Sequence, residues 1–156
     1  MLKTRILLVL FAVVGVLSSC SKEDFDAEKQ ATIDDKLIVD FITQNNIPAT
    51  KHSSGLYYQI ITPGTGASAT AASTVGVNYE GKLLNGNQFD KSTQTVSFPL
   101  SRVIQGWTIG VPLIKAGGRI RLIVPSALAY GNTSPGGGAI PANAVLDFTI
   151  DLVNVQ

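Results

Sequence analysis

The chain has 156 residues, of which 45% are hydrophobic and 15% are charged, so it can bury the core of one ordinary domain and is not globally disordered. Its 12 lysines and arginines stand against 11 aspartates and glutamates, so it lacks the basic surplus of a nucleic-acid-binding domain. A single cysteine excludes a disulfide framework and a multi-cysteine zinc site, and a single histidine leaves little material for a metal centre or a histidine-based triad.

The first twenty residues are typical of an export signal. Lys3 and Arg5 precede an uncharged apolar run over 6–17, which is shorter than the about 20 residues that a membrane-spanning helix needs. The run ends in Leu17-Ser18-Ser19-Cys20, which resembles the bacterial lipobox, where cleavage precedes the cysteine and the thiol is acylated. We therefore expect residues 1–19 to be a lipoprotein signal peptide and Cys20 to carry a lipid anchor such as palmitate. The alternative is an ordinary secretory signal with an incidental cysteine.

The segment after Cys20 is polar and charged, and residues 20–31 are expected to form a flexible tether. Its Lys22-Glu23-Asp24 resembles the acidic export tag of bacterial surface lipoproteins, although a solvated linker has the same composition. Ser21 directly after the cysteine favours the outer membrane by the rule known for enteric bacteria. We therefore expect a lipid-anchored protein of the bacterial cell envelope, held at the outer membrane and facing the periplasm or the surface.

A helix is predicted over 32–46, within an N-terminal helix and linker at 32–52. Apolar residues recur there at helical spacing: Ile33, Leu37, Ile38, Phe41 and Ile42. Thr32 is expected to cap this helix, and Asn45 and Pro48 to end it. Because the stripe is apolar it must pack on something. We favour docking onto the following domain, and the alternative is a homodimer through residues 32–46.

From Gly55 the pattern changes to short segments rich in β-formers. The expected strands cover 56–61, 75–81, 95–100, 119–124 and 145–153. Asn85-Gly86 predicts a hairpin turn. Alternation in the last strand turns Leu146, Phe148, Ile150 and Leu152 toward the core, whereas Ile123 is expected to face outward with Arg119 and Arg121. The only helical candidate in this part is 105–111, whose two glycines make it a poor helix that tertiary contacts must hold.

The chain lacks the HExxH, Gly-x-Ser-x-Gly and Walker motifs of common hydrolases and nucleotide-binding proteins. It offers aromatic side chains instead: Tyr79, Phe89, Phe98, Trp107, Tyr130 and Phe148. Aromatic residues at strand positions usually pack in a core. Trp107, which follows Gly106 in a poor helix, is better explained as the floor of a pocket, and the hydroxyls of Tyr79 and Tyr130 need hydrogen-bond partners.

Six strings, in order, carry a resemblance to a known family. They are Val77-Asn78-Tyr79-Glu80-Gly81, Gly86-Asn87-Gln88-Phe89-Asp90, Val103-Ile104-Gln105-Gly106-Trp107, Leu128-Ala129-Tyr130-Gly131, Ile140-Pro141-Ala142-Asn143 and Leu146-Asp147-Phe148. Together they resemble FKBP-type peptidyl-prolyl cis-trans isomerases, and the preceding helix is similar to that of secreted bacterial members, including macrophage-infectivity-potentiator-like proteins. The resemblance implies an α+β fold over 53–156, a bent five- to six-stranded antiparallel sheet wrapped around one short helix.

The resemblance also implies the site. Trp107 would lie under the prolyl ring of the substrate. The other expected substrate-binding residues are Tyr79, Phe89, Asp90, Phe98, Val103, Ile104, Tyr130, Ile140 and Phe148. Four residues would be catalytic: Tyr130 and the Ile104 backbone N–H as donors to the substrate, Asp90 as the holder of polar partners near the twisted carbonyl, and Trp107. The loop over 131–139 lacks the aromatic or histidine that some members carry there, which bears on the preference for the residue before proline.

Such a site needs no acid, base, metal or cofactor. Rotation about an amide costs ~18–20 kcal/mol because resonance makes the C–N bond partly double, and an apolar pocket raises the charge-separated planar form more than the twisted one. The expected function is therefore isomerisation of Xaa-Pro bonds in exported proteins, with proline-containing polypeptides as substrates, macrolides as inhibitors and no nucleic-acid partner. The alternative is a chaperone or peptide-binding surface lipoprotein that uses the same groove without turnover.

Overall fold

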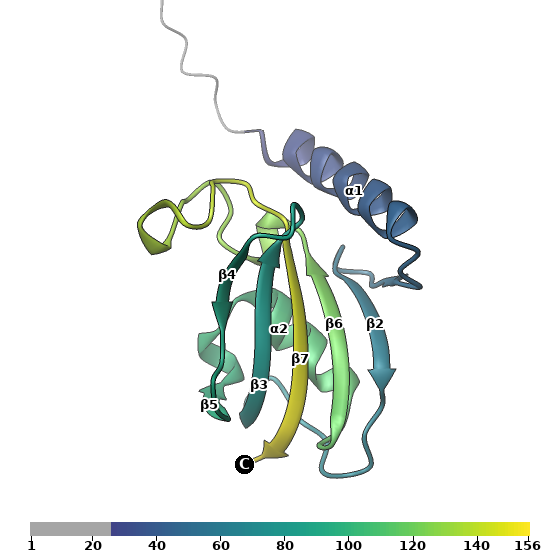
Figure 1. The fold of residues 1–156 in the computed structure, drawn as a ribbon, viewed down its shortest axis with the longest axis vertical. Helices are drawn as coiled ribbons and strands as arrows, with labels where there is room; N and C mark the ends of the chain where they lie inside the picture. Colours follow the sequence, from purple (N-terminus) through teal and green to yellow (C-terminus); the bar gives the residue numbers. More distant parts are fainter. Residues whose placement is uncertain (1–25) are drawn as a thin grey trace, which may run out of the picture.

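An antiparallel sheet, two α-helices and four three-residue 3-10 helices are the elements of residues 26–156, the part of the chain that the computed structural model describes (Figure 1). The expected signal peptide and Cys20 lie outside the described residues. The α-helices are α1 (Ala27–Gln44) and α2 (Gln105–Gly110). The strands are β1 (Thr50–Lys51), β2 (Tyr57–Thr62), β3 (Thr74–Leu83), β4 (Gln88–Lys91), β5 (Val96–Pro99), β6 (Gly118–Val124) and β7 (Leu146–Val155).

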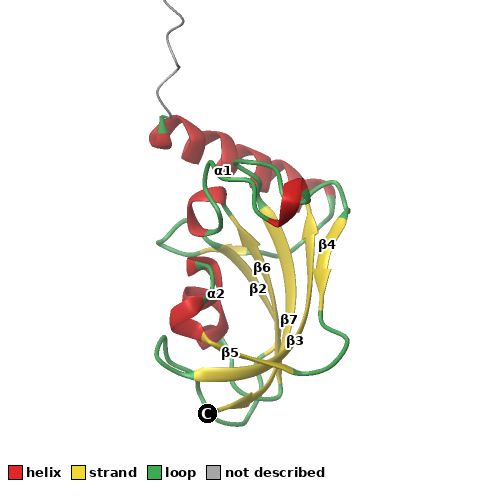
Figure 2. Cartoon of the chain, turned by 90° about the vertical axis from the view of Figure 1, so that its left-hand side faces the viewer, coloured by secondary structure: helices red, strands yellow, loops and turns green. Residues whose placement is uncertain are grey.

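The sheet bends around α2, which packs against its inner face (Figure 2). Its order is β1-β2-β6-β7-β3-β4, with β5 pairing the other end of β3, and every pair is antiparallel. This architecture confirms the expected α+β class. The sheet has seven strands rather than five or six, because the two-residue β1 extends one edge and both β4 and β5 pair with β3.

Strand alternation fills the space between the sheet and α2. The expected inward residues of β7 are buried, from Leu146 at 0% exposure to Phe148 at 4%. Ile120 and Leu122 of β6 are fully buried on the same side. The Asn85-Gly86 turn joins β3 to β4 as expected, with Gly86 at a φ of 89°. This core holds α2 in place and so positions the residues that α2 carries.

The two glycines of α2 allow the helix to lie directly on β6. A Cβ on Gly106 would lie 2.5 Å from a methyl of Val124, and one on Gly110 would lie 2.6 Å from a methyl of Leu122. Both approaches are closer than van der Waals contact, so the sheet excludes any larger residue. Tertiary contact therefore holds a helix of low propensity, as predicted.

Gly110→Ala is expected to lower the free energy of unfolding by about 1–3 kcal/mol, because the added methyl overlaps Leu122. Urea denaturation measures the change. In a protein that already carries Leu122→Ala, the same substitution should cost less, because the opposing side chain has gone. Additive effects of the two substitutions would contradict the proposed overlap.

Helix α1 begins at Ala27, so the expected start at Thr32 is wrong and the tether expected over 20–31 includes helical residues. The Asp26 carboxyl caps the helix and accepts hydrogen bonds from the N–H groups of Glu28 and Lys29 at 3.1 and 3.0 Å. Thr32 lies inside the helix, where its hydroxyl donates to the Glu28 carbonyl. The other end is as predicted, with Asn45 as the C-cap.

One side of α1 docks on the outer face of the sheet. Ile38 is fully buried in a cluster with Tyr57 and Ile123, which confirms the favoured docking. Ile123 points to the outer face as predicted, and α1 covers it there, so that it is only 1% exposed. Ile33 and Leu37 remain 43% and 46% exposed, so only part of the apolar stripe is used.

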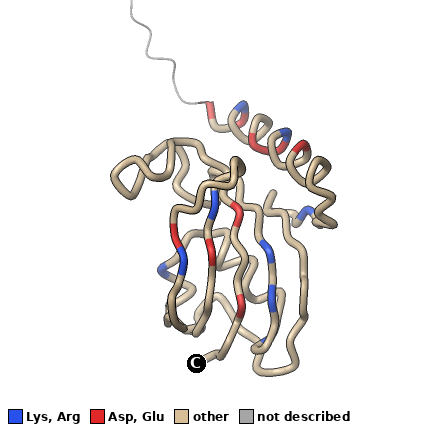
Figure 3. Tube along the Cα trace, viewed as in Figure 1, with Lys and Arg blue, Asp and Glu red and all other residues tan. Residues whose placement is uncertain are grey.

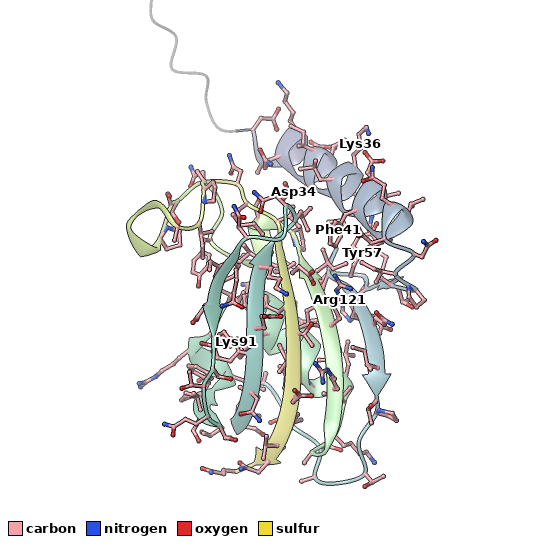
Figure 4. The ribbon with its side chains drawn as sticks, in the orientation of Figure 1. Asp34, Lys36, Phe41, Tyr57, Lys91 and Arg121 are labelled. Carbon is pink, nitrogen blue, oxygen red and sulfur yellow. The ribbon has the colours of Figure 1, made fainter. Side chains whose placement is uncertain are left out.

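An ion pair lies beside this docked helix. Arg121 of β6 donates two hydrogen bonds to Asp147 of β7, from Nε at 2.9 Å and from a terminal nitrogen at 2.7 Å. The Phe41 ring of α1 lies 5.7 Å from the Arg121 guanidinium carbon, and Figure 4 shows both between α1 and β6. Charges of opposite sign occupy neighbouring strands of this face (Figure 3). This pair, unlike its neighbours, is largely shielded from water.

Candidate active site

A pocket of about 280 Å³ opens between α2 and the inner face of the sheet. That volume is close to the lower end of the ~300–1,000 Å³ of small-ligand sites, which suits one small ring and its neighbouring groups. Strands β3, β4, β5 and β7, the start of α2 and the segment after β6 supply its walls. The lining residues are Tyr79, Phe89, Asp90, Phe98, Arg102, Val103, Ile104, Trp107, Tyr130 and Phe148.

The Trp107 indole forms the floor of this pocket. Three rings meet it edge to face: Tyr79 at a centroid distance of 5.1 Å, Phe148 at 5.4 Å and Phe98 at 5.8 Å. This arrangement is the favourable one for aromatic pairs. The Trp107 side chain is largely buried, and its Nε1 has no hydrogen-bond partner among the described residues. The ring is thus fixed by packing and presents an apolar surface to the opening.

A glycine in β3 makes room for two of the pocket's rings. A Cβ on Gly81 would lie 2.7 Å from atoms of both Phe89 and Phe148. Because glycine has no Cβ, these two rings can meet edge to face with their centroids 5.5 Å apart. Gly81 belongs to the first of the six strings, yet its role becomes visible only when the strands are paired.

Polar groups lie at the edge of the apolar floor. The Tyr79 hydroxyl donates to Asp90 Oδ2 at 2.7 Å, as the family resemblance implies, and the Lys91 N–H donates to Asp90 Oδ1 at 2.8 Å. Tyr130 is 38% exposed at the mouth. The Ile104 amide nitrogen, just before α2, donates no backbone hydrogen bond within residues 26–156. Around an apolar ring site the pocket therefore presents the Tyr130 hydroxyl and the Ile104 N–H as donors and the Asp90 carboxylate as an acceptor.

Burial, with the hydrogen bond to Asp90, raises the pKa of Tyr79 from 10.0 to about 12. Because the folded-state pKa lies above the ordinary value, the protonated phenol stabilises the fold fully below pH 10, and this contribution is lost as the pH rises from 10 to about 12. Alkaline titration by tyrosinate absorbance should show a step near pH 12 that Tyr79→Phe removes. The control Tyr57→Phe should retain that step, and ionisation of Tyr79 near pH 10 would contradict the expectation.

Two residues depart from the predicted set. Ile140 does not line the pocket, because its side chain packs into the main core and is 7% exposed. Arg102 does line it and is absent from the predicted set, which consists of apolar, aromatic and hydroxyl-bearing residues and Asp90. The signal was available, since Arg102 directly precedes Val103-Ile104, and both of those residues reach the pocket.

A short helix held in a bent antiparallel sheet, with an aromatic pocket between them, defines the FKBP-like class of α+β domains. Residues 66–153 match the family model described as FKBP-type peptidyl-prolyl cis-trans isomerase, and they make up more than half of the chain. The chain belongs to the FKBP-type peptidyl-prolyl cis-trans isomerase family.

Known proteins similar to this chain agree with that assignment. The FKBP-type peptidyl-prolyl cis-trans isomerase FkpA of Aeromonas hydrophila is 38% identical over 139 residues, which cover 87% of this chain and 50% of the relative. FkpA of Escherichia coli is 43% identical over 107 residues, 67% of this chain and 39% of the relative. The chain thus spans about half the length of the curated relatives that it matches.

Solved structures show the same likeness. The crystal structure of FkpA from Escherichia coli matches with a TM-score of 0.71 and 36% identity, over 83% of this chain and 62% of that one. A peptidyl-prolyl cis-trans isomerase from Pseudomonas syringae matches with a TM-score of 0.70 and 32% identity, over 85% of this chain and 98% of that one.

Within residues 26–156, no helix has the length and hydropathy needed to cross a membrane.

Proposed function

We propose that this chain catalyses the cis–trans isomerisation of Xaa-Pro peptide bonds in exported proteins. The observation that supports the proposal best is an indole floor, Trp107, that is open to the pocket beside Tyr130 and Asp90. A prolyl ring is apolar and small, so it fits this floor, and the adjoining peptide bond then lies among the polar groups at the mouth. Proline-containing polypeptides are the substrate class.

The chemistry follows from where the amide is placed. A planar amide is more charge-separated than a twisted one, so removal from water raises the planar ground state relative to the transition state. Each ~1.4 kcal/mol of this difference accelerates rotation tenfold. The aromatic walls of the pocket exclude water from the ring and from the C–N bond. No proton has to leave carbon or nitrogen.

The donors at the mouth hold the neighbouring groups while the bond rotates. Within residues 26–156 neither the Tyr130 hydroxyl nor the Ile104 N–H donates a hydrogen bond, so both are available for substrate carbonyls on either side of the proline. Asp90 accepts a hydrogen bond from the Tyr79 hydroxyl at 2.7 Å, and in the proposed complex this pair would lie beside the carbonyl that turns. When these hydrogen bonds hold the groups on one side of the amide, only the other side has to turn. The bound substrate is thereby kept close to the twisted geometry.

An isomerisation assay on a proline-containing peptide tests the proposal. The chain should accelerate exchange well above the uncatalysed relaxation, which takes ~10–100 s at 25 °C. Tyr130→Phe and Asp90→Val should each lower kcat/KM by about tenfold, since each removes one polar contact worth ~1.4 kcal/mol. Tyr58→Phe and Asp151→Val serve as matched controls, because neither residue lines the pocket.

The outcome also decides the alternative. If the intact chain leaves exchange at the uncatalysed rate but still binds the peptide, it is a peptide-binding or chaperone module rather than an isomerase.

We propose that macrolides occupy the same apolar site. Rapamycin should therefore quench or shift the fluorescence of Trp107 and block turnover, and fluorescence that does not change with rapamycin would contradict this.

The proposed location rests on the N-terminal residues. A lipidated Cys20 would hold the chain on the outer membrane of the cell envelope, with the isomerase domain beyond it. Radiolabelled palmitate should enter the intact protein and not Cys20→Ser. Equal labelling of both, or labelling of neither, would support the alternative of an ordinary secretory signal.

A homodimer is proposed on the part of α1 that docking leaves free. Ile33 and Leu37, one turn apart, are 43% and 46% exposed and form an apolar strip. Sedimentation should show that Leu37→Glu halves the mass of the particle, while Lys36→Glu, on the neighbouring exposed position, does not. A monomer mass for the unaltered protein would reject the dimer.

A further inference from the structure

Helix α1 carries a fully buried carboxyl group, that of Asp34, at its contact with the end of β6. Its Oδ2 accepts two hydrogen bonds from Ser126, from the backbone N–H at 2.8 Å and from the hydroxyl at 2.6 Å. Its Oδ1 accepts a third from Gln30 Nε2 at 2.7 Å. Figure 4 places Asp34 on the side of α1 that faces the sheet. A buried polar group is costly unless it is bonded in this way, so the geometry of the contact is strongly specified.

Ser126 in turn fixes the backbone on both sides of Tyr130. Its carbonyl accepts hydrogen bonds from the Ala129 N–H at 3.0 Å and from the Gly131 N–H at 2.8 Å. The Tyr130 carbonyl accepts from the N–H and the hydroxyl of Thr133, at 3.2 and 2.5 Å. Tyr130, the donor at the pocket mouth, thus lies in a turn that is closed by hydrogen bonds to Ser126, the residue that binds Asp34.

The side chain of Tyr130 depends on this turn for its position. It is 38% exposed, whereas Trp107 on the pocket floor is 4% exposed and is held by three rings. Because few side chains pack around it, the position of the Tyr130 hydroxyl is determined by the backbone of the turn. A shift of about 1 Å in a positioning group is enough to cost up to ~10²-fold in rate.

We propose that Asp34 is a positioning residue for Tyr130, so that α1 takes part in the isomerase site without lining it. This inference rests on the proposed isomerase function. The hydrophobic contacts of Ile38 already dock α1 and do not require a carboxyl at position 34. What the carboxyl adds is a pair of hydrogen bonds to Ser126, which no apolar residue can supply.

The neighbouring residue Asp35 provides a matched control. It also joins α1 to the domain, by accepting hydrogen bonds from Lys51 Nζ at 2.5 Å and from the Tyr57 hydroxyl at 2.8 Å. It has no contact with Ser126 or the Tyr130 turn among these bonds. Loss of Asp35 therefore weakens the docking of α1 while leaving the proposed positioning intact.

The test compares kcat/KM for a proline-containing peptide. Asp34→Ala should lower it by about tenfold, which is ~1.4 kcal/mol of transition-state stabilisation. Asp35→Ala should leave it unchanged, and Asp34→Asn, whose amide oxygen can accept from Ser126, should restore most of the loss. In a Tyr130→Phe background Asp34→Ala should cost nothing further, because the hydroxyl that it positions is absent. Ser126→Ala replaces Asp34→Ala if the latter fails to fold.

Amide hydrogen exchange gives a readout that does not depend on activity. In Asp34→Ala the Gly131 amide should exchange about tenfold faster than in Asp35→Ala, because its turn opens locally. Equal exchange in the two variants, an equal loss of kcat/KM in Asp35→Ala, or a full loss in the Tyr130→Phe background would each overturn the proposal. If the unaltered protein shows no turnover, the proposed function fails, while the Gly131 exchange still decides whether Asp34 holds the turn.

Discussion

Trp107→Ala is expected to lower kcat/KM for prolyl isomerisation by about a hundredfold, the equivalent of ~2.7 kcal/mol. The substitution removes the proposed floor for the prolyl ring and opens the pocket to water, so the planar amide would no longer be desolvated. It also deprives the rings of Tyr79, Phe98 and Phe148 of their shared partner. The free energy of unfolding should fall by about 3–5 kcal/mol, as for other buried aromatic-to-alanine changes.

The two effects are separated by a variant that only loses stability. Leu152→Ala removes a core side chain of β7 that is 1% exposed and does not line the pocket. It should lower the free energy of unfolding by about 2–5 kcal/mol. At a temperature where circular dichroism shows both variants folded, kcat/KM should fall only in Trp107→Ala. A Trp107→Ala protein with wild-type turnover would refute the role of the indole.

Arg121→Met is expected to lower the free energy of unfolding by about 3–5 kcal/mol, because it leaves the buried Asp147 carboxyl without its partner. The hydrogen bonds that Arg121 donates to Asp147 raise the pKa of Arg121, so the guanidinium stays charged throughout the ordinary pH range. The Asp147 side chain is 10% exposed, so water cannot replace the two lost donors. Thermal unfolding measures the change.

Arg119→Met is the matched control on the same strand. Its pair with Asp151 is longer, at 3.6 Å, and both side chains are about half exposed, at 50% and 42%. Such surface pairs contribute ~0–1 kcal/mol, so this variant should unfold close to the wild-type temperature. Replacing Arg121 and Asp147 together by Met and Leu should restore most of the lost stability. Equal costs for Arg119→Met and Arg121→Met would show that burial does not distinguish the two pairs.

Local periodicity was sufficient to predict most strands of the sheet, whereas the short helix at 105–111 was predicted as one that tertiary contacts must hold. Alternation located the inward residues of β7, and the Asn85-Gly86 turn located the β3–β4 hairpin. The start of α1 was missed because its first turn, Ala27 to Gln30, has no apolar stripe, and the signal was the cap at Asp26 instead. Periodicity reports burial, whereas helix ends are set by hydrogen bonds.

The pocket was predictable to the extent that the six strings carry it. Tyr79, Trp107 and Tyr130 converge as the family resemblance implied. Arg102 was missed although it directly precedes two predicted pocket residues, and the predicted Ile140 packs into the core, which chain order alone does not show. The hydrogen bonds between Asp34 and Ser126 could not be predicted, since those residues lie 92 positions apart in the sequence.

The surface of the sheet on which α1 docks has a consequence for the order in which the chain folds. This docking surface consists of Tyr57 from β2, Ile123 from β6 and Val145 just before β7, so it does not exist until those strands have paired. Pairing of such distant segments is the slow part of assembling an antiparallel sheet. We expect α1 to dock last, after the strands have enclosed the hydrophobic core, so the hydrogen bonds between Asp34 and Ser126 should also form last.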